Sequence, residues 1–108
     1  MLEELKIIAL FMGDINSLDA KVSFNKNCTV DELQYHKSWD WLMPVVEKIE
    51  SLNFSIEMNK QEEGDYQCLI IKKDILVQTF SNNKIEAVYN AVIKFLSHER
   101  RNNNKMVG

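Results

Sequence analysis

The sequence predicts an α+β protein, in which an antiparallel sheet of three to four strands packs with helices, with an α/β/α sandwich as the expected arrangement. Two stretches of good helical period flank three short strand patterns joined by short connections. The chain has 108 residues, which suits one domain with one hydrophobic core. We expect that domain to span residues 1–97, followed by a polar, frayed tail at residues 98–108.

The first predicted helix covers residues 2–12. Its apolar residues recur at helical spacing: Leu2, Leu5, Ile8, Ala9 and Met12. Gly13 is a natural stop for this helix. After a loop, an alternating pattern over residues 21–25 indicates a weak strand.

A capping-box pattern follows at Thr29 and Glu32. The Thr29 side chain can accept from the amide of the third helical residue while Glu32 reaches back. We therefore expect a short helical turn that continues through Tyr35. Either Ser38 or Asp40 then caps the next helix, because both side chains can accept from free amides.

The helix expected over residues 39–52 contains both tryptophans and the only proline. Its buried stripe is predicted to comprise Trp39, Leu42, Val46 and Ile49. Pro44 falls on the opposite side and faces water. An interior proline costs about 3 kcal/mol, whereas a proline in the first turn costs little. Two interpretations stay open: the regular helix begins near Asp40, or a longer helix bends outward at Pro44.

The two tryptophans have different predicted positions. Trp39 lies in the stripe and is expected in the core. Trp41 lies at the edge of the stripe, beside Leu52. There its indole either packs under a loop or forms an interface with a partner or a second subunit.

Three strand patterns follow, over residues 54–59, 66–72 and 75–80. The short turns between them, at residues 61–65 and at Lys73-Asp74, make neighbouring strands antiparallel. Because the second and third patterns are apolar on both faces, we expect helices on both sides of the sheet.

The last predicted helix begins after Asn82 or Asn83, since residues 83–86 repeat the capping-box spacing with asparagine as the cap. One apolar stripe follows, made of Ile85, Val88, Tyr89, Val92, Phe95 and Leu96. From His98 onward the apolar period is lost.

The charge is mildly acidic and unevenly distributed. Thirteen Lys/Arg against 16 Asp/Glu give a net charge of −3. Residues 84–108 carry five basic against two acidic residues, a balance of +3. These cations complement the dipole of the last helix, or Arg100, Arg101 and Lys105 contact an anion or a nucleic acid.

The sequence predicts a cytoplasmic protein with no membrane partner. The start MLEELK lacks the positive charge of a secretory signal, and the apolar run at residues 7–12 is too short to span a bilayer. In that compartment Cys28 and Cys68 are expected to remain reduced thiols.

Two segments carry a resemblance to known proteins. They are Tyr-x-x-Ser-Trp-Asp-Trp-Leu-Met-Pro-Val-Val-Glu-Lys-Ile (residues 35–49) and, after the strands, Ser-x-x-Lys-Ile-Glu-Ala-Val-Tyr-x-Ala-Val (residues 81–92). Their order resembles a group of small phage and prophage proteins of Bacteroidetes and is similar, more distantly, to the phage alpha-beta-alpha sandwich domain family. The resemblance extends from the first helix to about Leu96. It implies a compact sandwich and a mobile-element origin, and it supplies no catalytic residue or ligand.

No catalytic, cofactor-binding or metal-binding constellation is recognisable in the sequence. His36 and Asp40 are four residues apart, which suits one helical face, but two ligands do not make a metal site. Cys28 can approach His36, yet nothing orients that histidine as a base. The glycines are scattered and form no phosphate loop. We therefore expect no enzymatic activity, no cofactor and no metal.

The predicted function is a small, non-catalytic interaction module of phage or mobile-element origin. Its candidate interface comprises Tyr35, Trp41 and Leu52, because tyrosine and tryptophan are favoured anchors. The strand at residues 54–59, if at a sheet edge, can also pair with a copy of itself. The alternative is a nucleic-acid-associated accessory protein that uses the basic C-terminal end.

Overall fold

In chain order, the three strands follow the second α-helix and precede the third. The computed structural model describes residues 2–22, 28–73 and 75–107. The elements are α1 (Leu2–Met12), the 3-10 turn η1 (Val30–Glu32), α2 (Trp39–Ser51), β1 (Ser55–Lys60), β2 (Tyr66–Lys72), β3 (Ile75–Ser81) and α3 (Lys84–Val107). The strands form one antiparallel sheet in the order β1-β2-β3. The predicted α+β class is confirmed.

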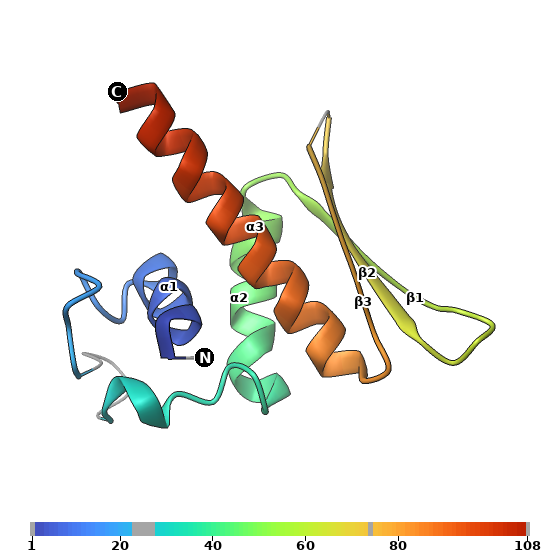
Figure 1. Ribbon diagram of the computed structural model, residues 1–108, viewed down its shortest axis with the longest axis horizontal. Coiled ribbons are helices and arrows are strands. Elements are labelled where there is room, and N and C mark those ends of the chain that lie inside the picture. The colour runs from blue at the N-terminus through green and yellow to red at the C-terminus, as the bar shows by residue number, and fades with distance from the viewer. Residues whose placement is uncertain (1, 23–27, 74, 108) are drawn as a thin grey trace.

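The layers are arranged with the sheet on one side of the molecule (Figure 1). α2 and α3 pack against one face of the sheet, and α1 lies beyond them, away from the strands. Within the described ranges, the helix layer expected on each sheet face is found on one face only. No helix of the described ranges covers the other face.

α1 has the predicted bounds and ends at Met12, directly before Gly13. Gly13 has a φ of 82°, a left-handed conformation that glycine adopts without a steric penalty. Asp14 N then donates to Ala9 O at 2.8 Å, which satisfies one of the free carbonyls at the helix end. Leu5, Ile8 and Ala9 are buried.

The segment after α1 contains less regular structure than the sequence predicts. Val22 forms an isolated bridge with Thr29, and residues 23–25 of the expected weak strand lie outside the described part. Glu32 reaches back to accept from Thr29 N at 3.2 Å, as the capping box predicts. The turn ends at Glu32, however, and does not continue through Tyr35.

α2 begins at Trp39, with Ser38 as its N-cap in an extended conformation. Pro44 is exposed on the outer side of this helix, as predicted. Proline has no N–H, so the carbonyl of Asp40, four residues earlier, has no helical donor. Asp40 is exposed, so water can hydrogen-bond to this carbonyl instead. The buried residues of α2 are Leu42, Val45, Val46 and Ile49. Trp39, which was expected in the core, is only half-buried.

α3 begins where asparagine capping predicts, because Glu86 N donates to Asn83 Oδ1 at 3.2 Å. The helix continues through residues 98–107, where the loss of apolar period predicts a frayed tail. Once a helix exists, each further residue adds one backbone hydrogen bond. α3 can therefore continue past His98 without an apolar face. Beyond Glu99 the structure describes the backbone and not the side chains.

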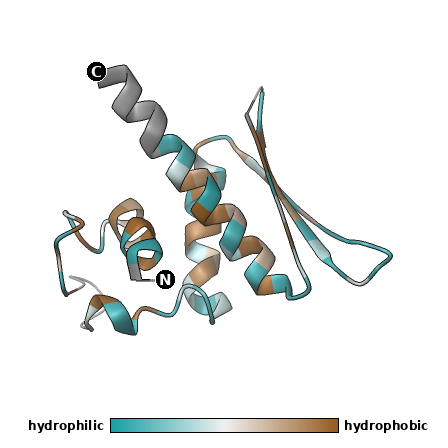
Figure 2. Cartoon of the chain, in the orientation of Figure 1, coloured by the Kyte–Doolittle hydropathy of each residue, from teal (hydrophilic) through white to brown (hydrophobic). Residues whose placement is uncertain are grey.

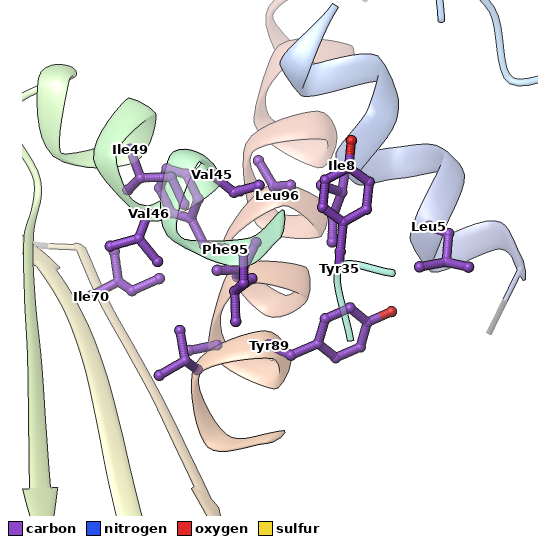
Figure 3. Close-up of a cluster of buried hydrophobic side chains, with 14 of the residues drawn as sticks. Leu5, Ile8, Tyr35, Val45, Val46, Ile49, Ile70, Tyr89, Phe95 and Leu96 are labelled. Carbon is purple, nitrogen blue, oxygen red and sulfur yellow. The ribbon is translucent and has the colours of Figure 1, made fainter. Parts of the chain in front are cut away.

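The core lies between the three helices and one face of the sheet (Figure 3). Phe95 of α3 is 1% exposed and packs edge-to-face on Phe54, with ring centroids 4.6 Å apart. Ile70 of β2 and Ile49 of α2 are fully buried in the same cluster. Elements distant in the sequence therefore share one hydrophobic core.

Candidate functional site

The two faces of the sheet follow from the register of its strands. Side chains alternate between faces along a strand, and paired residues share a face. The inner face, which meets the helices, carries Ile56, Met58, Lys60, Tyr66, Cys68, Ile70, Lys72, Val77 and Thr79. The outer face carries Ser55, Glu57, Asn59, Gln67, Leu69, Ile71, Leu76, Gln78 and Phe80.

The inner face is closed by α3. Cys68 and Ile70 have no exposed surface, and Val77 is 4% exposed. Thr79 Oγ1 donates to Ala87 O of α3 at 2.7 Å, which ties the helix to the edge of the sheet. Because burial removes the Cys68 thiol from water, its pKa rises to about 11, and this thiol stays protonated near neutral pH.

The outer face is apolar along β2 and β3. Leu76 is 60% exposed and Phe80 is 50% exposed, while Leu69 and Ile71 are half-buried. Ile71 lies directly opposite Leu76, and Phe80 lies diagonally across from Leu69. These four residues therefore form one contiguous patch, which we call the outer patch.

The sheet has two edges of different chemistry. β1 has the sequence SIEMNK, with Glu57 and Lys60, whereas β3 has the sequence ILVQTFS and carries no charge and no proline. Figure 2 shows the turn that joins β1 and β2 as a hydrophilic segment beside these strands. The outer patch therefore borders the uncharged β3 edge, and at Phe80 it also meets Glu62, Glu63 and Asp65 of this turn.

The predicted interface does not form as one surface. Tyr35 is 1% exposed, and its hydroxyl donates to Asp14 Oδ2 at 2.6 Å in the interior. The prediction that Tyr35 contributes to an exposed interface is wrong, because this buried hydrogen bond draws the ring into the core between α1 and α3 (Figure 3). Burial raises the pKa of the Tyr35 hydroxyl, and the hydrogen bond to Asp14 raises it further.

The other two residues of that prediction lie apart from each other. Trp41 is half-buried and packs edge-to-face on Tyr35, with centroids 5.4 Å apart. Leu52 is 45% exposed at the C-terminal end of α2. They are eleven positions apart along α2 and its C-cap, which is about 16 Å along the helix axis. They cannot form a single small patch.

His36 lies in a pocket formed with residues of α1 and of the start of α3. The pocket has a volume of about 340 Å³ and is lined by Glu4, His36, Asn83, Ile85, Glu86, Tyr89 and Asn90. Neither Cys28 nor Asp40 belongs to this lining. Tyr89 donates to Glu4 Oε1 at 3.0 Å, and the pKa of His36 is lowered by burial and by Lys37.

Metal ligation finds no support in the described residues, where no group of three His, Cys, Asp or Glu side chains is placed to hold an ion. Cys28 is a half-buried thiol and Cys68 is a buried thiol.

The candidate nucleic-acid residues lie at the end of α3. Arg100, Arg101 and Lys105 are part of its helical backbone, but their side chains lie outside the described part. Of the sheet aromatics, Phe54 is buried at 9% exposure and cannot stack on a base. Phe80 is exposed, but it lines a pocket with Glu62, Glu63 and Asp65, against which Lys60 is the one basic residue of the lining. It therefore does not lie on a basic platform.

None of the helices in the described part of the chain combines the length and apolar character that a bilayer crossing requires. No protein-family model, curated protein or solved structure matches this chain.

Proposed function

We propose that this protein is a small, non-catalytic interaction module that binds another polypeptide through the outer patch and the adjoining β3 edge. The observation that carries the proposal is the exposure of Leu76 and Phe80, 60% and 50%, on a sheet face without helical cover in the described residues. Single exposed apolar residues are ordinary on protein surfaces. A contiguous exposed patch is typical of interaction sites.

The position of the patch adds a second reason. It borders a strand edge whose outward backbone groups can hydrogen-bond to another extended chain. A partner at this edge gains main-chain hydrogen bonds from β3 and apolar contacts from Leu76 and Phe80. We further propose a cytoplasmic location and a phage or mobile-element origin, the latter on the resemblance of residues 35–49 and 81–92.

The test is site-specific photo-cross-linking in the native host cell. A photoreactive phenylalanine analogue replaces Phe80 in one variant and the exposed Glu47 of α2 in a control variant. We expect a discrete cross-linked band from position 80 and none from position 47. Equal labelling at both positions, or none at either, contradicts the proposal.

A further inference from the structure

We infer that the polypeptide bound at the β3 edge is a second copy of this chain, and that β3 pairs antiparallel with β3 of that copy to give one continuous sheet. This inference rests on the proposed function and identifies the partner polypeptide as a second copy of the same chain. It is carried by the chemistry of the two edges, by the exposure pattern of β3 and by the symmetry of its register.

The two sheet edges differ in their protection against pairing. Natural edge strands avoid association by carrying charges, prolines or bulges. β1 carries Glu57 and Lys60, so its edge is protected in this way. β3 is seven residues long and carries no charged residue and no proline. Of the two edges, self-pairing is therefore expected at β3 and not at the 54–59 segment.

The register of β3 is self-complementary about Gln78. Leu76 and Phe80 each lie two residues from Gln78 and share its outer face. A two-fold axis through Gln78 therefore sets Leu76 of each copy directly opposite Phe80 of the other. Aliphatic and aromatic side chains in such cross-strand positions pack on each other, so pairing covers the two most exposed side chains of the outer patch.

The residue on the axis also suits a symmetric contact. Gln78 is exposed and uncharged, and its side-chain amide offers both donors and an acceptor. Two facing Gln78 amides can hydrogen-bond to each other, whereas two facing charges repel. Through Leu69 of β2, Gln78 is aligned with Glu57 of β1. If β1 paired with β1 of a second copy about the corresponding axis, two Glu57 carboxylates would face each other and repel.

One charged side chain from α3 reaches the β3 edge. Lys94 Nζ donates to Gln78 O at 3.3 Å. A carbonyl oxygen has two lone pairs, so this contact leaves capacity for a bond to a partner strand. Two ammonium groups then lie near the axis and repel each other. Because salt screens this repulsion, the dimer should tighten as ionic strength rises, opposite to the behaviour of nucleic-acid binding.

The decisive experiment is disulfide trapping with a matched control. Paired antiparallel residues have Cα atoms about 4.5–5.5 Å apart, within the range that a disulfide spans. Gln78→Cys places a thiol on the proposed axis, and Glu57→Cys places one on the same row at the other edge. After mild oxidation we expect a covalent dimer from Gln78→Cys and at least tenfold less from Glu57→Cys. Both variants keep Cys28 and Cys68, so any background from these thiols is common to them.

A second pair of variants tests the register. Leu76→Cys mixed with Phe80→Cys should give a mixed disulfide, and each variant alone should give several-fold less. Equal trapping by Gln78→Cys and Glu57→Cys indicates random collision and overturns the inference. Trapping of Leu76→Cys with itself in preference to Phe80→Cys overturns the register.

Sedimentation equilibrium of the unmodified chain separates this inference from the proposed function. We expect a monomer–dimer equilibrium that Leu76→Lys shifts to monomer and Glu57→Gln does not. A wild-type monomer at all concentrations, together with cross-linking of Phe80 to a different protein, overturns self-association and leaves the interaction module intact. Failure of the Phe80 cross-link overturns the module itself.

Discussion

Ile70 and Ile71 are adjacent, identical residues of the central strand with opposite environments. Ile70 points to the inner face and has no exposed surface, whereas Ile71 points to the outer face and is half-buried. The difference arises entirely from α2 and α3, which lie on one side of the sheet. The comparison teaches that an apolar strand residue is a core residue only where another element covers its face.

The largest expected effect comes from truncating the two isoleucines. Ile70→Ala should lower the free energy of unfolding by about 2–5 kcal/mol, because it leaves a cavity in a closed core. Ile71→Ala, the matched control, removes the same atoms from a half-exposed position and should cost about 1 kcal/mol. Urea denaturation of both variants measures the difference. Equal losses would show that the outer face is covered in solution.

An intermediate effect is expected from pH, through the buried thiol of the inner face. The pKa of Cys68 is about 11 in the folded chain against an ordinary value of 9.0. The folded state therefore keeps a proton that the unfolded state loses between these values, and stability falls as pH rises through this window. One such group changes the free energy of unfolding by at most about 1.4 kcal/mol per pH unit.

Cys68→Ala is the control for that pH effect, since it removes the thiol. It leaves Tyr35 and Tyr89, whose raised pKa values also lower the free energy of unfolding at high pH. Urea denaturation at several pH values should give a steeper loss of stability for the wild type than for Cys68→Ala. Parallel curves would mean that the inner face is open to water at Cys68.

The smallest effect is expected on the outer face. Leu76→Ser should change the free energy of unfolding by no more than about 0.5 kcal/mol, because the side chain is largely exposed. Its neighbour Val77 points to the inner face and is 4% exposed, so Val77→Ser buries a hydroxyl and should lower the free energy of unfolding by about 1–3 kcal/mol. Both are measured in dilute solution, where a dimer is dissociated. A large loss for Leu76→Ser would place that residue in the core.

Local signals in the sequence were sufficient for much of the fold. The bounds of α1 and β2 are as predicted, and so are the Asn83 cap and the exposure of Pro44. Each depends on a few consecutive residues: a glycine stop, a period of two, or an asparagine before a helix. Such signals act over a single turn or strand and need no information from the rest of the chain.

The candidate site was harder to predict because it depends on which surfaces remain uncovered. Tyr35 was expected in an interface, but its hydroxyl bonds to Asp14, 21 residues earlier in the chain. Trp39 was expected in the core and is half-buried, since it is the first residue of α2. Leu76 and Phe80 lie in a strand whose sequence resembles that of any half-buried strand. No local pattern indicates that their face is left uncovered by the helices of the described part of the chain.

By itself the sequence determined the class of the protein, the order of α1, α2, β1, β2, β3 and α3, and the asparagine cap of α3, because propensity and periodicity are properties of neighbouring residues. The tertiary structure decided which sheet face is closed and which stays open. That choice follows from where the connections allow α2 and α3 to pack, and both lie on the same side of the strands. One face therefore became core, and the equally apolar strand residues opposite became surface.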